Sequence, residues 1–295
     1  MKILMITPLY PTDRNPGLGI FVKRIESIYR ELGYEVDLIP YGSGASPWEK
    51  MANVRRFLKT IRAKVKAGDY DLVNVQYPFL APLAFGRLKL TKPLVTTLHG
   101  TDAKPDSLVK KVLLPWTGRL LRRSDLVLVN SRFYKDFVMD RYRLTDQAVR
   151  LCPAGGYDPA VFFPPSERAR GEVRWLGFAG RITAKKGWRL ALEAYENLLA
   201  LARDPLGLKL AGQGEDMADL RQAVQRIQAS YPQARIQVLG NLDDSSLADF
   251  YRSLDLFLFP TLYEESLGLV AIESLASGCP LVASDKGAVG DYVQE

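Results

Sequence analysis

Short apolar runs recur along the first half of the chain and are separated by stretches long enough to hold a helix. The runs are Ile3–Ile6, Val36–Ile39, Leu72–Val75, Leu94–Leu98, Leu126–Val129 and Val149–Leu151. Compact β-branched and aliphatic runs are typical of buried strands, and their alternation with helical stretches indicates βαβ units. The first half is therefore predicted to fold as a doubly wound parallel sheet.

Two of the intervening stretches show helical spacing. Residues 15–32 predict a helix, because apolar residues recur at near-helical intervals and Gly33 follows as a stop signal. Trp48–Val65 has apolar residues at the same spacing with lysines and arginines nearby, which predicts a basic amphipathic helix. Such a helix is either a core helix with a solvated basic face or part of a surface that docks on anionic lipid. The other residues of that surface would be Lys110, Lys111, Trp116, Arg119, Arg122 and Arg123.

The pattern breaks at Pro153–Pro165, a stretch of proline, glycine and alanine that is typical of a linker. Beyond it the alternation of strands and helices resumes. The later runs are Arg174–Ala179, Leu208–Ala211, Ile236–Leu239, Leu256–Phe259 and Leu281–Ala283. The α/β chain of 295 residues is thus expected to form two Rossmann-like domains, residues 1–165 and residues 166–295.

The end of the second half supports a further expectation. A complete doubly wound half usually has about six strands, whereas this half offers five candidates and the chain stops soon after the last of them. The second domain is therefore expected to be C-terminally incomplete, with apolar surface exposed as a result.

Composition excludes several classes of protein. Hydrophobic residues make up 47% and charged residues 25%, as in ordinary globular proteins, and no run approaches the length of a membrane span. Cys152 and Cys279 lie far apart without a zinc-like spacing, which favours a reducing, cytoplasmic location. The net charge is +11 for residues 1–165 and −4 for the remainder, so the first half is expected to face an anionic partner.

Ligands of parallel sheets collect beyond the carboxyl ends of the strands, so residues that follow each run are the candidate site. In the first half these are Gly17 and Gly19 in the first loop and His99, the only histidine. A dinucleotide fingerprint needs a third glycine and an immediate turn into the helix, and both are missing here, which disfavours an NAD site. The alternatives for these residues are a flexible turn and a histidine that merely completes a strand end.

In the second half, Arg181 and Lys186 follow a strand and precede a predicted helix at Trp188–Leu199. Two cations beside a helix N-terminus form an anion site, although a solvated pair of charges is an equal alternative. Gly212, in the sequence Gly-Gln-Gly after the next strand, permits a close approach of the backbone to a ligand.

The most informative segment is Pro260–Pro280. It places Glu265 in a loop and Glu273 inside the apolar stretch Leu269–Ala276, with seven residues between the two glutamates. A carboxylate in apolar surroundings needs a partner, and its two oxygens suit a vicinal diol such as a ribose. The alternative, which the residues alone favour, is an ordinary glutamate on the surface of a helix. Backbone amides from Leu267 to Leu269, around Gly268, open the helix and suit a phosphate.

Five motifs occur in this order along the chain. They are the glycine loop, LHGTD (98–102), GRITAKKG (180–187), AGQG (211–214) and the spaced glutamates followed by SLASGCPLVAS (274–284). In these motifs the chain resembles the retaining GT-B glycosyltransferases, in particular family 4, over nearly its whole length. The resemblance implies that the two domains face each other across a cleft, the first taking the acceptor and the second the nucleotide-sugar donor.

The resemblance also implies a role for each candidate residue. Arg181 and Lys186 would hold the donor diphosphate, and Glu273 the ribose. Glu265 would bind hydroxyls of the transferred sugar, with His99 beside it. The glycines of the loop and of AGQG, Gly17, Gly19 and Gly212, would complete the donor site with the amides of Leu267, Gly268 and Leu269, although relatives usually have an aromatic residue at position 267.

The implied reaction needs neither metal nor cofactor. Asp69 and Asp71 match an Asp-x-Asp metal motif, but they precede the run Leu72–Val75 and so lie at the wrong edge of the sheet. The implied partners are a nucleotide-sugar donor, a lipid-linked or glycan acceptor in cell-envelope synthesis, and an anionic membrane surface at its inner face. Nucleic acid is disfavoured, because no basic motif interleaved with aromatic residues occurs.

Two rival functions use the same features. A non-catalytic binder would hold a nucleotide sugar or an anionic polymer without turnover. A nucleotide-sugar epimerase shares the two-domain architecture but needs further acid and base residues, and this chain has one histidine. The paired motifs of the second half favour the transferase.

Overall fold

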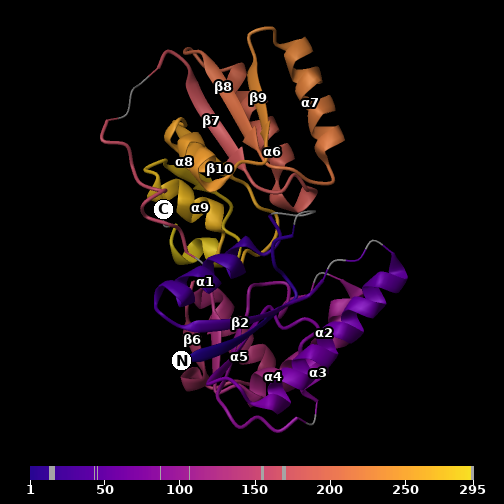
Figure 1. Cartoon of the computed structure of the whole chain (residues 1–295). Coiled ribbons are helices and arrows are strands. Elements are labelled where there is room, and N and C mark those ends of the chain that lie inside the picture. The colour runs from indigo at the N-terminus through magenta and orange to yellow at the C-terminus, as the bar shows by residue number, and fades with distance from the viewer. Residues whose placement is uncertain are drawn as a thin grey trace. The chain divides into compact units, whose positions relative to one another are not determined.

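The computed structural model describes residues 1–12, 17–42, 44, 46–86, 88–105, 107–153, 156–167 and 171–293. The chain divides into two compact domains, Met1–Gly156 and Tyr157–Glu295. Each domain is a parallel sheet with helices on both faces (Figure 1). The α/β class and every strand predicted from the sequence are confirmed.

The elements of the first domain alternate between strand and helix. They are β1 (Lys2–Thr7), α1 (Ile20–Glu31), β2 (Glu35–Pro40), α2 (Pro47–Ala67), β3 (Leu72–Gln76), α3 (Pro82–Phe85), β4 (Leu94–Thr97), α4 (Leu108–Arg123), β5 (Leu126–Val129), α5 (Arg132–Tyr142), the 3₁₀ turn η1 (Asp146–Ala148) and β6 (Val149–Leu151). The strand order is β2-β1-β3-β4-β5-β6.

Successive residues of β1 face opposite sides of the sheet, which is why both faces need a helical cover. Leu4 and Ile6 pack in one cluster with residues of α2, α3 and α4. Met5 packs instead against Val22 of α1. The buried, apolar character of these central strands is what made them recognisable in the sequence.

The second domain repeats the plan with a different order. Its elements are β7 (Arg174–Ala179), η2 (Ala184–Lys186), α6 (Trp188–Leu199), β8 (Leu206–Ala211), α7 (Met217–Ser230), β9 (Arg235–Gly240), α8 (Asp244–Arg252), β10 (Leu256–Phe259), α9 (Leu269–Ala276), β11 (Leu281–Ala283) and η3 (Ala288–Asp291). The strand order is β11-β10-β7-β8-β9. Helices α6 and α7 pack on the face that carries Phe178, and α8 and α9 on the face that carries Phe257.

Two boundaries differ from the sequence prediction. The domain boundary falls after Gly156 rather than after residue 165, because Phe162 is buried in the core of the second domain with Tyr251. Helix α1 begins at Ile20 rather than at residue 15, because Gly19 has a left-handed φ of 66° that helical backbone cannot adopt. Residues 15 and 16, at the start of the predicted helix, lie outside the described part of the chain.

Candidate functional site

The strand order of the second domain creates a crevice at the carboxyl ends of β7 and β10. From β7 the chain winds to β8 and β9 on one side, and it then returns to β10 on the other. Loops that leave two such neighbouring strands diverge to opposite faces, and ligands of doubly wound sheets bind at this point. Arg181 and Lys186 follow β7, and Glu265 follows β10, so the fold brings these predicted residues to one place.

An ion pair joins the two loops. The Lys186 Nζ atom lies 2.7 Å from Glu265 Oε1, and both side chains are largely buried. The hydroxyl of Tyr263 donates to Glu265 Oε2 at 2.8 Å, and that of Thr261 donates to Oε1 at 3.2 Å. Three groups therefore fix the Glu265 carboxylate in one orientation at the sheet edge.

The lysine of this pair remains charged despite its burial. Burial alone would lower the pKa of Lys186, but the negative charge of Glu265 and the contacts with Tyr263 outweigh it and raise the pKa. The ammonium also lies 4.8 Å from the centre of the Tyr263 ring, a favourable cation–π distance. The site thus offers a fixed positive charge at neutral pH.

A pocket of about 170 Å³ opens at the same edge of the sheet. Its walls include residues that follow β7, β8 and β9, together with one residue of α9: Gly180, Arg181, Gly212, Asn241 and Val270. Gly212 is required here, because a Cβ atom would lie 1.8 Å from the Gly180 carbonyl oxygen. Arg181 is exposed, and within the described residues its guanidinium makes no hydrogen bond or ion pair, so it is available to a ligand in the pocket.

The start of α9 has the predicted form. Gly268 has a φ of 81°, Leu269 is the first helical residue, and the Leu267 carbonyl oxygen accepts a hydrogen bond from the Tyr292 hydroxyl at 2.7 Å. The first amides of any helix have no partner within it and carry the positive end of its dipole. The anion-binding turn expected from the sequence therefore has the helix start that it needs. Tyr292 fixes the backbone at this turn.

Glu273 lies deeper than the sequence prediction implied. Its side chain is buried on α9, and its charge contributes to raising the pKa of the buried Tyr251 hydroxyl, for which burial is the larger cause. Val270, and not Glu273, is in the wall of the pocket. Glu273 is thus a buried carboxylate near Tyr251, and its role toward a ribose stays a prediction.

Replacing Glu273 by glutamine tests that role. If its oxygens bind the ribose diol, Glu273→Gln should weaken binding of the nucleoside diphosphate by about tenfold, because one acceptor oxygen becomes a donor. Isothermal titration calorimetry with UDP and GDP measures this. Glu193→Gln, at an exposed position of α6, is the control. Unchanged affinity would restrict Glu273 to a structural role.

In the first domain, His99 follows β4 and is held on two sides. Its Nε2 atom lies 2.7 Å from Oε1 of Gln76, the last residue of β3, and its ring lies 4.4 Å from that of Phe21 on α1. Burial lowers the pKa of His99 to about 3, so the imidazole is neutral at physiological pH. His99 is therefore suited to polar contact with a neutral ligand.

Asp102 holds the His99 loop and was missed in the sequence. Its carboxylate accepts hydrogen bonds from the backbone amides of His99, Gly100 and Ala103. Burial raises the pKa of Asp102 to about 6, while these amides act to lower it. The signal was present, since an aspartate shortly after a strand is typical of a side chain that caps a loop.

The predicted loop glycines differ in what they contribute. A Cβ atom on Gly19 would lie 2.5 Å from the Leu9 carbonyl carbon, so the loop closes on itself only with glycine there. A Cβ atom on Gly17 would meet nothing within 4 Å. The structure therefore explains Gly19 and leaves Gly17 as a turn residue.

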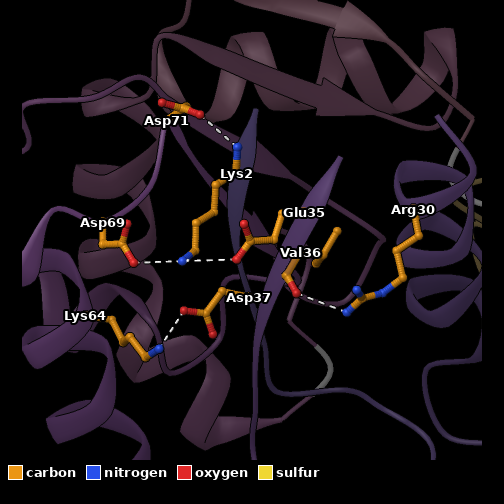
Figure 2. A network of polar contacts seen from close by, with 8 residues as sticks. All are labelled: Lys2, Arg30, Glu35, Val36, Asp37, Lys64, Asp69 and Asp71. Atoms are coloured by element: carbon orange, nitrogen blue, oxygen red, sulfur yellow. Dashed lines mark hydrogen bonds and ion pairs between the residues drawn. The ribbon is translucent and has the colours of Figure 1, made fainter. Parts of the chain in front are cut away.

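Asp69 and Asp71 lie at the amino edge of the first sheet, as predicted (Figure 2). The Lys2 ammonium contacts Asp69 at 2.7 Å and Glu35 at 3.1 Å, and the Lys2 amide donates to Asp71 at 2.8 Å. Figure 2 shows this network joining β1, β2 and the residues before β3. The two aspartates thus tie the bottom of the sheet together, at the edge opposite the candidate site.

Two family models match the chain, one for each domain. Residues 14–156 match Glycosyltransferase Family 4, and residues 162–295 match Glycosyl transferases group 1. The chain belongs to the GT-B glycosyltransferases. The family resemblance noted in the sequence is thus confirmed, and the matched segments of this glycosyltransferase lie in both domains.

Curated relatives of this glycosyltransferase act on different substrates. Phosphatidyl-myo-inositol mannosyltransferase of Mycolicibacterium smegmatis is 28% identical over 310 residues, covering 97% of this chain and 76% of the relative. Mannosylfructose-phosphate synthase of Agrobacterium fabrum is 30% identical over 181 residues, which are 57% of this chain and only 39% of that protein.

Solved structures support the fold of the glycosyltransferase over its full length. Sucrose-phosphate synthase of Thermosynechococcus elongatus has a TM-score of 0.72 at 19% identity, covering 97% of this chain and 82% of that one. Anabaena HepE in complex with UDP and glucose has a TM-score of 0.69 at 18% identity, covering 100% and 83%. At such identities the likeness concerns the fold alone.

Proposed function

We propose that this glycosyltransferase transfers a sugar from a nucleoside diphosphate donor to an acceptor hydroxyl with retention of the anomeric configuration, in the synthesis of cell-envelope glycolipid or polysaccharide. The observation that carries the proposal is the buried Lys186–Glu265 pair beside the pocket that Arg181 lines. It combines fixed cations, which suit a diphosphate, with an oriented carboxylate, which suits sugar hydroxyls. UDP and glucose in HepE, and the mannosyltransferase relative, support the substrate class.

The reaction breaks the bond between the anomeric carbon and the diphosphate oxygen and forms a bond from that carbon to the acceptor oxygen. The acceptor proton passes to the departing phosphate oxygen, so no protein nucleophile is needed. Negative charge grows on the diphosphate as the sugar leaves. Lys186, Arg181 and the first amides of α9 therefore bind more tightly in the transition state than in the ground state.

The decisive experiment is a screen of donors followed by analysis of the product. UDP-glucose, UDP-galactose, ADP-glucose and GDP-mannose are incubated with candidate lipid and glycan acceptors, and nucleotide release is measured. Proton NMR of the purified product then reads the configuration of the new linkage. Retention supports the proposal, inversion refutes the stereochemistry, and binding without turnover would favour the non-catalytic rival.

We further propose that the first domain docks on an anionic membrane surface, where a lipid-linked acceptor is met. Most of helix α2 does not provide this surface, because its apolar stripe is buried at Phe57, Ile61 and Val65 and is exposed only near the helix start, at Trp48 and Met51. Helix α4 differs, since Leu108, Val112 and Trp116 are exposed at helical spacing. Its exposed basic residues are Lys111, Arg119, Arg122 and Arg123.

Apolar side chains on the solvent face of a basic helix fit the boundary between lipid headgroups and acyl chains. No helix in the described part of the chain is long and apolar enough to cross a bilayer. We propose that the exposed face of α4 binds at the cytoplasmic face of the membrane.

Co-sedimentation with vesicles tests this docking. At low salt we expect binding to vesicles of phosphatidylglycerol and phosphatidylcholine and little to phosphatidylcholine alone. The variant Leu108→Ser with Val112→Ser should lose at least half of the bound fraction. Leu201→Ser in the second domain is the matched control, since Leu201 and Leu108 are both 77% exposed. Equal binding to neutral and anionic vesicles, or none to either, would refute the surface.

A further inference from the structure

The segment after β11 is fastened to the loop that carries Glu265. Gly287 forms a parallel bridge with Glu265, and the Ala288 amide donates to the Glu265 carbonyl oxygen at 2.9 Å. A Cβ atom on Gly287 would lie 2.5 Å from that same oxygen, so the two backbones touch. The chain then passes through η3 and returns to the loop at Tyr292. The loop is therefore held first by backbone and then by a side chain.

The hydroxyl of Tyr292 holds one peptide group of this loop. It donates to the Leu267 carbonyl oxygen at 2.7 Å, whereas the Gly268 carbonyl oxygen lies 3.5 Å away. Burial raises the pKa of Tyr292, and the negative charge of Glu265 acts in the same direction, so the hydroxyl keeps its proton and remains a donor. The peptide between Leu267 and Gly268 is trans and planar, so its N–H points away from its C=O. By holding the carbonyl, Tyr292 directs the Gly268 N–H to the opposite side.

The Gly268 amide is the first of three successive amides at the start of α9. Among the residues that the structure describes, the N–H groups of Gly268, Leu269 and Val270 donate to no other group. Gly268 is left-handed, with φ 81° and ψ 56°, and the helix begins at Leu269. A left-handed residue followed by a right-handed one turns successive N–H groups toward one point, and such a nest binds anions. Val270 also lines the pocket of Arg181, so the nest and the guanidinium border the same space.

Gly268 and Tyr292 are fitted to each other. A Cβ atom on residue 268 would lie 2.6 Å from the Tyr292 hydroxyl oxygen. The hydroxyl thus occupies the space that a side chain at this position would need. The conformation of the turn and the place of Tyr292 are therefore set together.

We propose that Tyr292 is a positioning residue that sets the direction of the Gly268 amide, so that this amide joins those of Leu269 and Val270 in binding the diphosphate of the nucleotide-sugar donor. A diphosphate has several charged oxygens, so it can accept hydrogen bonds from the nest and from Arg181 at once. The identity of the anion rests on the proposed function. The direction of the amide does not.

Binding of inorganic pyrophosphate, UDP and uridine to the wild type and to Tyr292→Phe tests the proposal. Phenylalanine keeps the ring and removes only the hydroxyl. We expect pyrophosphate and UDP to bind about tenfold more weakly to the variant, because the Gly268 amide is no longer held toward the anion. Uridine has no phosphate and should bind the two proteins equally. Isothermal titration calorimetry measures the three affinities.

Amide NMR separates positioning from a merely structural role. In the wild type, pyrophosphate should shift the ¹⁵N–¹H signals of Gly268, Leu269 and Val270, and in Tyr292→Phe the shift of the Gly268 signal should shrink most. Tyr195→Phe is the matched control, because the Tyr195 hydroxyl also donates to a backbone carbonyl oxygen of the second domain, that of Leu206 at 3.1 Å. It should leave all three affinities unchanged.

The outcomes distinguish the role of Tyr292 from the proposed function. Equal pyrophosphate affinity in the wild type and Tyr292→Phe overturns the proposal, and so does an equal loss for uridine, which would make Tyr292 a structural residue. If Tyr292→Phe does not fold, the wild-type spectra decide, since a Gly268 amide turned away from the anion would not respond to pyrophosphate. The expected binding without transfer from any donor would leave the role of Tyr292 standing and remove the proposed sugar transfer.

Discussion

Replacing Lys186 by alanine should lower kcat by at least about a hundred-fold, because it removes a fixed positive charge from the place where the departing diphosphate gains negative charge. The assay is nucleotide release with the donor found in the screen. Lys185→Ala is the matched control, since Lys185 is the adjacent, exposed lysine of the same turn. A rate equal to that of Lys185→Ala would remove Lys186 from the proposed chemistry.

The structure changes what the same variant should do to stability. From the sequence alone Lys186 is one of two cations beside a helix and its loss should leave the fold intact. In the structure it neutralises the buried Glu265 at 2.7 Å. Removing one member of a buried pair costs about 3–5 kcal/mol, because the other charge is left uncompensated.

A second substitution separates the two effects. Adding Glu265→Gln to Lys186→Ala should restore much of the lost stability, because no buried charge remains, while kcat should stay low. Arg181→Ala should lower kcat without a comparable loss of stability, since Arg181 is exposed. Urea unfolding of the wild type, Lys186→Ala, the double variant and Arg181→Ala measures these stabilities. An Arg181→Ala protein as unstable as Lys186→Ala would contradict the view that Arg181 serves only the ligand.

The sequence predicted the strands well because a parallel strand buried on both faces must be apolar. Ile3–Ile6 and Leu256–Phe259 are such runs, and each lies within an observed strand. Residues such as Arg181 and Glu265 were then found by their order alone, since they follow strand ends that share one edge of the sheet. The spacing of apolar residues and the order of strands and loops can both be read along the chain, so a single sequence reveals them.

Side-chain contacts that form only in the folded chain were not predictable in this way. Tyr263 and Thr261 lie in a loop whose sequence does not reveal that their hydroxyls converge on Glu265. The sequence singles out neither Asn74, which lies in the predicted run Leu72–Val75, nor Gln76, which follows that run, because their contacts are with Val95 and His99 in other segments. The domain boundary was misplaced for the same reason, since only packing shows that Phe162 belongs to the second core.

Gly187 lies where the loop after β7 packs against Pro260 at the end of β10. Gly187→Ala should destabilise the second domain by at least about 3 kcal/mol. Its φ is 76°, and a Cβ atom would lie 1.8 Å from the Pro260 carbonyl oxygen. Backbone cannot move aside as a flexible side chain can. The loops after β7 and β10 would therefore separate, and with them Lys186 and Glu265, so kcat should fall as well.

Gly33→Ala is the control that isolates the conformational part of this effect. Gly33 has a similar φ of 81°, but a Cβ atom there would meet nothing within 4 Å. Gly33→Ala should lower the free energy of unfolding by about 1 kcal/mol and leave kcat unchanged, because the only cost is that alanine disfavours left-handed backbone. If urea unfolding shows equal losses for the two variants, the close approach of Gly187 to Pro260 does not hold the site together, and the ion pair must be positioned by its own hydrogen bonds.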